Sequence, residues 1–348
     1  MKKIIAMVLT LAISMGMFAG CAGVPVVMEQ QTGKEEEGLA AVTGQGAVKT
    51  GLSVITNMSA QEASFEADGT VTTDISLVGV LVNDSGVIEA CAIDAIQGKV
   101  SFDQEGQLVM EPGEILSKNE LGDDYGMRAA SPIGKEWNEQ AAFIAQYAVG
   151  KTLEELKTKA IDEAGMVKDA DLASGATVYM GSFIWAIEDA INNAKYYGAG
   201  SGDRLILTDV STSLGSESAT LQKDGSAVVN SNVTVMTMDG DKISSCIIDA
   251  VSTKAAFKAD GTLAEEVTKN VLSKAQLGEN YGLKAYSSIG KEWDQQTLAF
   301  CEYITGKTIE EVKGISLTET TAPADADLSA SVSIAIGDFM QLVEKAAK

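Results

Sequence analysis

The sequence contains no histidine, and cysteine, proline and tryptophan are scarce, with four, four and three residues in 348. Without an imidazole side chain, the protein cannot build a Ser-His-Asp or Cys-His nucleophile system, nor a zinc or haem site with histidine ligands. The cysteines form no C-x-x-C pair, and the carboxylates show no EF-hand spacing such as D-x-D-x-D-G. We therefore expect no metal site and no catalysis that depends on histidine.

Basic side chains are outnumbered as well, because 26 Lys and Arg stand against 49 Asp and Glu, for a net charge of −23. Such a surface repels nucleic-acid phosphates and anionic lipid headgroups, so neither is expected as a partner of the folded part. A hydrophobic content of 45% is enough for packed cores, and the length suggests about two domains of ordinary size.

The N-terminus has the features of an export signal. A short basic segment (residues 1–3) precedes an almost uninterrupted apolar run (4–18) that is too short to span a bilayer well. The run ends in FAGC at residues 18–21, which resembles the lipobox of bacterial lipoproteins, where small residues precede an acylated cysteine. We expect a lipoprotein signal peptide at 1–20 and acyl chains on Cys21 that anchor the protein at the extracytoplasmic face of the cell membrane. The alternative is an ordinary secretory signal with an incidental cysteine.

The segment that follows, residues 21–48, shows no sustained hydrophobic period and includes the charged run KEEE at 34–37. We interpret it as a flexible tether between the lipid and the folded body, with the charged run in solvent.

The rest of the chain is a tandem repeat with an offset of 156 residues. About half of the positions are identical between residues 117–157 and 273–313. Each unit is about 150 residues long, enough for an independent domain, and we assign the units to 49–198 and 199–348. The stretch YGAGSG at 197–202 predicts a hinge between them.

Strands are expected first in each unit. In the first unit, residues 53–57, 70–81 and 87–96 alternate or run apolar and are separated by Asp-Gly or Asp-Ser-Gly turns, as in antiparallel hairpins.

Helices are expected next. The first begins at a cap on Ser131, with Pro132 in the first turn, and ends at Gly150, and a short helix follows Thr152. The last helix carries an apolar stripe of Phe183, Ile187, Ala190, Ile191 and Ala194. The predicted fold class is α+β, with two tandem homologous domains that each contain an antiparallel sheet followed by helices.

One motif, DLASGAT at residues 171–177, places the hydroxyl of Thr177 shortly before the last helix of the first unit. Its Gly and Ala neighbours are expected to leave the backbone open, so that a large reagent can approach the hydroxyl and free amides can hold an anion. The alternative is a turn of small residues that only leads into the helix.

The same residues resemble the flavinylation motif D-x-x-S-G-A-T of the FMN-binding domain family, which includes flavinylated lipoproteins of bacterial extracellular electron transfer. In that family, a flavin transferase moves FMN from FAD onto the last Thr as a phosphoester. The resemblance implies covalent FMN on Thr177. It also implies four positions that the transferase recognises, Asp171, Ser174, Gly175 and Ala176.

The second unit departs from this motif, because residues 327–333 read DLSASVS. Ser333 keeps a hydroxyl at the position of Thr177, but the bulkier Ser331 and Val332 replace the small pair before it. Covalent attachment is therefore not expected here, and the unit is open to three interpretations: non-covalent flavin binding with Ser333 as a candidate contact, binding of another ligand, or a spacer.

Both units also contain GKEW, at 134–137 and 290–293, in a central segment that does not match the compact form of the family. A Trp or a nearby Tyr can stack on an isoalloxazine ring, and the Lys can stabilise a reduced flavin. We favour the alternative, in which Trp137 and Trp293 are core anchors of their helices and the Lys and Glu are solvated.

The cysteines that remain after acylation of Cys21 are Cys91, Cys246 and Cys301, and the first two occupy equivalent strand positions. An odd number without close spacing predicts buried free thiols rather than a disulfide framework.

Together, these expectations describe a lipid-anchored electron carrier with covalent FMN. Electrons would come from a membrane quinol or dehydrogenase and pass to an external acceptor, and the flavin would supply the redox chemistry. Because the chain lacks an acid/base set of its own, it is expected to be a carrier rather than a self-contained enzyme. The alternatives are a non-redox surface or ligand-binding lipoprotein built from a duplicated α+β module, and the flavoprotein subunit of a terminal reductase.

Overall fold

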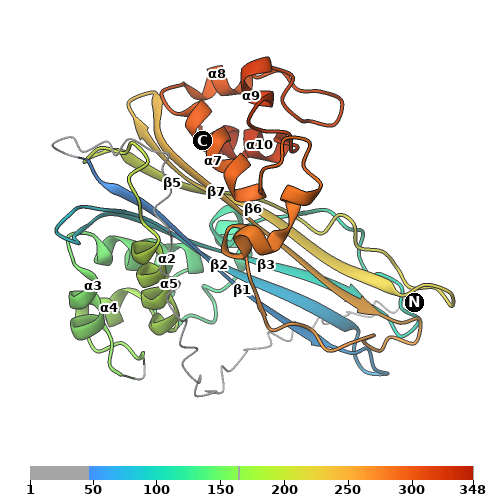
Figure 1. Cartoon of the computed structure of the whole chain (residues 1–348). Coiled ribbons are helices and arrows are strands. Elements are labelled where there is room, and N and C mark those ends of the chain that lie inside the picture. Colours follow the sequence, from blue (N-terminus) through green and yellow to red (C-terminus); the bar gives the residue numbers. More distant parts are fainter. Residues whose placement is uncertain (1–46, 164, 348) are drawn as a thin grey trace, which may run out of the picture. The chain divides into compact units, whose positions relative to one another are not determined.

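The long strands of each half come first and the helices follow, as the sequence predicts (Figure 1). The computed structural model describes residues 47–163 and 165–347, so the expected signal peptide, Cys21 and the tether up to residue 46 lie outside the described residues. The elements of the first half are β1 (Lys49–Gln61), β2 (Gly69–Val82), β3 (Ile88–Phe102), β4 (Glu114–Ile115), α1 (Lys118–Leu121), η1 (Gly122–Tyr125), α2 (Trp137–Ala148), α3 (Leu153–Glu155), η2 (Leu156–Ala160), α4 (Ala170–Gly175) and α5 (Met180–Asn192). Those of the second half are β5 (Arg204–Thr212), β6 (Gly225–Asp239), β7 (Lys242–Phe257), β8 (Asn270–Val271), α6 (Lys274–Leu277), η3 (Gly278–Tyr281), η4 (Leu283–Ala285), α7 (Trp293–Ile304), α8 (Ile309–Lys313), α9 (Ala326–Ser329) and α10 (Gly337–Lys345).

The turn between β2 and β3 illustrates how the hairpins are made. The side-chain oxygen of Asn83 accepts hydrogen bonds from the backbone N–H groups of Ser85 and Val87, at 3.0 and 3.1 Å. Gly86 has a φ of +74°, a conformation that residues with a Cβ rarely adopt. These contacts fix a tight turn, and the strands on either side pair antiparallel along their length.

Each half contributes three long strands to one sheet and a two-residue strand to the other. The first sheet has the order β3-β2-β1-β8 and the second the order β4-β5-β6-β7. β8 of the second half pairs with β1 of the first through Thr56 and Val271, and β4 pairs with β5 through Glu114 and Thr212. All of these pairs are antiparallel. The α+β class with antiparallel sheets is therefore confirmed.

Side chains from both sheets form shared hydrophobic clusters. The rings of Phe102 and Phe257 stack with centroids 4.0 Å apart and planes 2° from parallel. Gly79 lies so close to Val235 that a Cβ on the glycine would stand 2.6 Å from a valine methyl group. The two halves thus bury their inner strand faces against each other, and all of the described residues fall within one compact unit.

The expected hinge is packed as well. In the 197–202 stretch, Ala199 is buried, and its carbonyl accepts a hydrogen bond from the N–H of Val48 at 3.1 Å. Val48 itself is 1% exposed, and Ala47 forms a bridge with Gly200, so the last two residues of the expected tether belong to the folded body.

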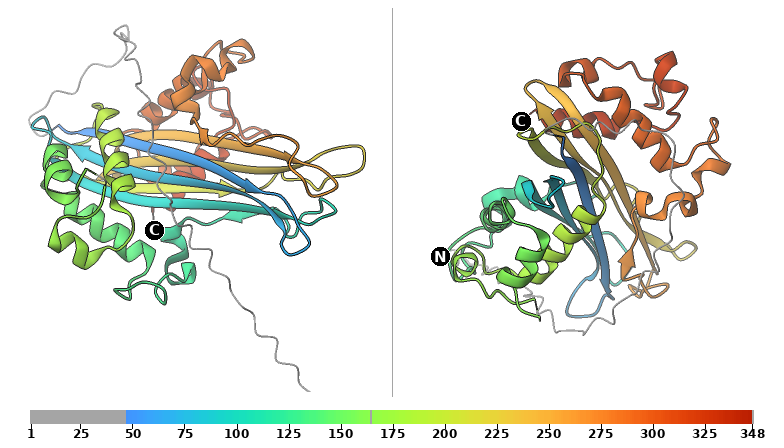
Figure 2. Two further views of the ribbon diagram at one scale, coloured as in Figure 1. Left: turned by 90° about the horizontal axis from the view of Figure 1, so that it is seen from below. Right: turned by 60° about the vertical axis from the view of Figure 1, so that its left-hand side comes forward.

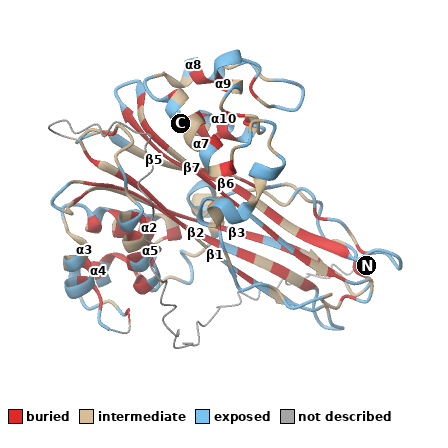
Figure 3. Cartoon of the chain, viewed as in Figure 1, coloured by how far each residue is buried: buried red, intermediate tan, exposed pale blue. Residues whose placement is uncertain are grey.

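The helices cover the remaining strand faces. α2 and α5 join the first sheet in one hydrophobic cluster, and α7 and α10 join the second sheet in another. In Figure 2 the two helical groups lie on opposite sides of the strands. Figure 3 shows buried residues along the strands and on the helix sides that face them. Strands buried on both faces explain the continuous run of buried residues from 77 to 82 in β2.

One helix boundary differs from the prediction. α2 begins at Trp137 instead of near Pro132, because residues 131–134 close a turn in which Gly134 donates to the carbonyl of Ser131. The N-cap is Glu136, which forms a capping box with Glu139. The prediction for the short helix is confirmed, since Thr152 caps α3 in the same way. The prediction for the last helix is confirmed by α5, although Ala194 lies beyond its end.

Candidate functional site

The DLASGAT motif forms the short helix α4 and the residues just after it. Asp169 caps α4 by accepting from the N–H groups of Asp171 and Leu172, at 2.9 and 3.1 Å. Four motif residues are exposed, namely Ala173 and the three polar residues Asp171, Ser174 and Thr177, which are spaced three apart. Three others are buried, namely Leu172, Gly175 and Ala176. The exposed set is accessible to a second protein, and the buried set belongs to the packing of the helix.

Thr177 is held by one buried glutamine. The side-chain oxygen of Gln140 on α2 accepts from the backbone N–H of Thr177 at 2.7 Å, from its hydroxyl at 3.2 Å and from the N–H of Val178 at 3.3 Å. The amide nitrogen of Gln140 donates to the Ser131 hydroxyl and to the Lys135 carbonyl. The amides at 177 and 178 are therefore paired, and the expectation of free amides for an anion is wrong.

Gly175 is small for a packing reason. A Cβ at this position would overlap the ring of Phe143, which projects from α2. The ammonium of Lys135 lies 4.9 Å from the centre of the same ring and 3.5 Å from the Gly175 carbonyl. The glycine thus admits an aromatic side chain beneath the motif, and the expectation that Gly and Ala leave the backbone open is wrong at Gly175 and Ala176.

The second half repeats the glutamine contacts with different packing. The side-chain oxygen of Gln296 accepts from the N–H of Ser333 at 2.8 Å and from its hydroxyl at 3.1 Å. The position of Phe143 is Ala299 here, and the position of Gly175 is Ser331. In the first half the large Phe143 faces Gly175, whereas in the second half the small Ala299 faces Ser331. Because no phenyl ring fills this space in the second half, the serine side chain fits there.

An aromatic pair beside Thr177 was missed by the sequence reasoning. The rings of Tyr179 and Trp185 meet edge to face with centroids 6.3 Å apart, and their residues are 41% and 53% exposed. The signal was present, because Trp185 falls off the apolar stripe of α5 and an exposed tryptophan is uncommon. The corresponding residues of the second half are Ala335 and Gln341, so this exposed pair is particular to the first half.

The GKEW segments are structural. Trp137 and Trp293 are each 5% exposed, which confirms them as core anchors. The solvated glutamate expected beside them is wrong, because Glu136 is 1% exposed and accepts from the backbone N–H groups at 127 and 128, at 2.9 and 2.7 Å. Glu292 makes the equivalent contacts in the second half.

The aromatic residues of this segment are also engaged within the protein. The ammonium of Lys118 lies 4.8 Å from the ring centre of Tyr125 and 5.1 Å from that of Trp137. Lys274 repeats both contacts with the corresponding Tyr and Trp of the second half. These cation–π contacts give the tryptophan a role within the fold, and it is not open for stacking on a ligand.

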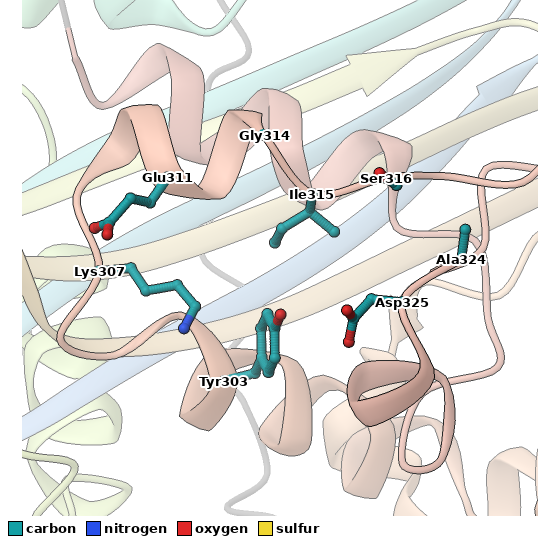
Figure 4. Close-up of a pocket in the computed structure, with 8 residues that line it drawn as sticks. All are labelled: Tyr303, Lys307, Glu311, Gly314, Ile315, Ser316, Ala324 and Asp325. Carbon is teal, nitrogen blue, oxygen red and sulfur yellow. The ribbon is translucent and has the colours of Figure 1, made fainter.

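A pocket of about 330 Å³ lies beside α9, the counterpart of the motif helix (Figure 4). Tyr303, Lys307 and Asp325 line it, and the Lys307 ammonium is 4.4 Å from the centre of the tyrosine ring. In the first half, the corresponding Tyr147 and Asp169 are hydrogen bonded. Burial, with the Asp169 carboxylate, raises the pKa of Tyr147 to about 12. The tyrosine is thus a neutral hydrogen-bond donor at every physiological pH.

Three strand carboxylates are buried, namely Asp94 of β3, Asp209 of β5 and Asp249 of β7. Asp209 of β5 is 2% exposed and takes the place that Val54 has in β1. Burial raises the pKa of Asp209 to about 7; the hydrogen bond from the Ser211 hydroxyl opposes this shift, and the nearby Glu120 carboxylate adds to it. This group therefore titrates near neutral pH in the folded protein.

Within residues 47–163 and 165–347, no group of three or more acidic or cysteine side chains is placed to hold a metal ion. No helix in the same part of the chain is long and apolar enough to cross a membrane. Compared with known proteins, the chain matches no family model, no curated protein and no solved structure.

Proposed function

We propose that this protein is a lipid-anchored, extracytoplasmic flavoprotein that carries FMN as a phosphoester on Thr177 and transfers electrons. A membrane quinol or dehydrogenase would be the donor and an external compound the acceptor. The observation that carries the proposal is the asymmetry of the two halves: Thr177 is exposed beside the exposed pair Tyr179 and Trp185, whereas Ser333 is half-buried without such a pair.

The residues around Thr177 suit an attached flavin. Asp171 and Ser174 are exposed on the same short helix and are accessible to a flavin transferase. Tyr179 and Trp185 are partly exposed aromatic side chains that follow the attachment point in the chain, and aromatic side chains of this kind can pack against a planar ring. Bound FMN supplies reversible one- or two-electron redox chemistry, and the chain supplies its attachment and orientation. This division of labour accords with a sequence that has no histidine.

The anchor and the duplication complete the proposal. Acyl chains on Cys21 would hold the protein at the outer face of the membrane through the tether. The two halves would be tandem homologous domains, supported by their common element order and by the Gln–hydroxyl contacts at the same positions. The second would serve as the packing partner of the first, without flavin at Ser333.

A second candidate is a non-redox, ligand-binding lipoprotein. It is favoured by the packing of Gly175 against Phe143 and by the hydroxyl–glutamine contacts in both halves, which explain the motif positions Gly175 and Thr177 by folding alone. The polar pocket at Tyr303 and Lys307 would then be the place to seek the ligand.

Coexpression of the exported chain with a flavin transferase separates the two candidates. We expect one FMN per chain by intact mass and flavin fluorescence in denaturing gels, loss of both in Thr177→Ala, and full loading in the matched control Ser333→Ala. An unmodified wild-type mass would refute the flavoprotein. Flavin retained in Thr177→Ala would place the attachment elsewhere.

A further inference from the structure

We propose that Cys246 and Cys301 form a disulfide bond that fastens helix α7 to strand β7. The two sulfur atoms are 3.2 Å apart, and the residues are 2% and 3% exposed. A disulfide requires a sulfur–sulfur distance of about 2.05 Å, so the two sulfur atoms have to approach each other by about 1 Å to form the bond. This site does not depend on flavin, and in the cell it rests only on the proposed export to an oxidising compartment.

The first half provides a natural comparison. Cys91 occupies the position of Cys246 on its strand, but the position of Cys301 is Ala145. The first half therefore has one thiol at this contact between helix and strand and the second has two. Cys91 is half-buried, unlike the buried thiol expected there, and has no second cysteine at this contact. Cys246 and Cys301 face each other in contact and are a site for a covalent link.

The surroundings of the pair are closed to solvent. The sulfur of Cys246 also lies 3.5 Å from the hydroxyl of Thr234, and burial raises the pKa of the Cys301 thiol well above its ordinary value. Since thiol exchange proceeds through the thiolate, oxidation in the finished fold is slow. The bond therefore forms while the chain folds, before α7 closes over β7.

The oxidant is a disulfide of the compartment or of the buffer. The thiolate of one cysteine attacks this disulfide and releases one reduced thiol, giving a mixed disulfide. The thiolate of the other cysteine then displaces the second thiol and forms the bond between Cys246 and Cys301. Two electrons pass to the oxidant, and the two protons of the cysteine thiols end on the two released thiols or in solvent.

The link would enclose the segment that carries β8. Residues 246 and 301 are 55 positions apart, and between them β8 pairs with β1 of the first half. The bond would thus restrict the unfolded chain over the segment that joins the second half to the first sheet.

Mass spectrometry of the exported full-length chain tests the proposal. Free thiols are alkylated in denaturant without reductant, and peptides are then mapped. We expect a linked pair of peptides containing Cys246 and Cys301, lower in mass by two hydrogen atoms than the sum of the reduced peptides, and full alkylation of Cys91. Alkylation of all three cysteines, both in the exported chain and after refolding in oxidised and reduced glutathione, would overturn the proposal.

Two variants sharpen the test. Cys301→Ala copies the first half, so Cys246 should become alkylated and the melting temperature should no longer respond to reductant. In the wild type, unfolding and refolding with reductant should lower the melting temperature by about 5–10 °C. Ala145→Cys gives Cys91 the partner that it lacks, and a second link there would show that this geometry is sufficient. An equal response to reductant in wild type and Cys301→Ala would count against the bond.

Discussion

Replacing Gly175 of the DLASGAT motif by serine, the residue at the same position of the second half, tests whether packing alone explains the glycine. In Gly175→Ser, the new Cβ would overlap carbon atoms of the Phe143 ring, whose centre lies 4.9 Å from the Lys135 ammonium. The second half has the serine without the clash, because Ala299 stands where Phe143 would be. The double variant Gly175→Ser, Phe143→Ala therefore copies a combination that already occurs in this protein.

The expected magnitudes follow from the contacts. Gly175→Ser overpacks a buried site and should lower the free energy of unfolding by about 1–3 kcal/mol. Phe143 is half-buried, so Phe143→Ala should cost about 2 kcal/mol, less than a fully buried phenylalanine. If the ring is what excludes the serine, the double variant should cost about 2 kcal/mol, which leaves a coupling of about 1–3 kcal/mol between the two positions.

Urea unfolding followed by circular dichroism and tryptophan fluorescence measures all four proteins in one double-mutant cycle. Costs that add within about 0.5 kcal/mol would refute the packing explanation of Gly175. The same variants also show whether Gly175 is needed for packing or for recognition by the flavin transferase. A double variant that folds stably but accepts no FMN would mean that the transferase reads the glycine itself.

Three further predictions concern the fold and its charges. Gln140→Leu leaves two amides and a hydroxyl without their acceptor and should cost about 2–4 kcal/mol by urea unfolding; Gln296→Leu should cost a similar amount, and a loss below 0.5 kcal/mol in both would contradict the role of the glutamines. Because the pKa of Asp209 is about 7 in the folded chain and about 3.9 when unfolded, the folded state binds the proton more tightly, so this group's stabilisation is present below pH 4 and is lost as the pH rises to about 7. Asp209→Asn should remove up to about 3 kcal/mol of that decline, measured by urea unfolding between pH 4.5 and 8, and an unchanged pH profile would contradict the raised pKa. Phe102→Ala opens the shared core at its stack with Phe257 and should cost about 3–5 kcal/mol, with both halves unfolding in one calorimetric transition; two separate transitions would show that the halves fold independently.

The strands were predictable from sequence because their turns and apolar patterns are local. Asn83 and Gly86 mark a hairpin wherever they are placed between apolar runs. The contact between the sheets was also signalled, since the unbroken run Val78–Val82 in β2 is typical of a strand buried on both faces. That run was interpreted only as a strand, and the question of what covers its second face was left open.

Other features were beyond local patterns. β4 and β8 have two residues each, too few for any periodicity, and their pairing with the opposite half depends on the tertiary fold. The start of α2 was misplaced because Ser131 and Pro132 form a typical helix start, whereas the fold places Glu136 where it satisfies backbone amides of another segment. A glutamate identical in both repeats gave no sign that it was buried.

The comparison of the halves separates what folding requires from what function can use. Gln140 and Gln296 have the same partners, so their identity in both halves needs no ligand to explain it. Positions that differ between the halves say more about function, because the same fold accepts either residue there and folding alone does not select between them. Tyr179 and Trp185 are 41% and 53% exposed, and the second half folds with Ala335 and Gln341 at their positions, so the fold does not require this aromatic pair. Since an exposed aromatic pair next to an exposed threonine occurs in only one of two otherwise parallel settings, the proposed redox chemistry is expected in the first half and not in the second.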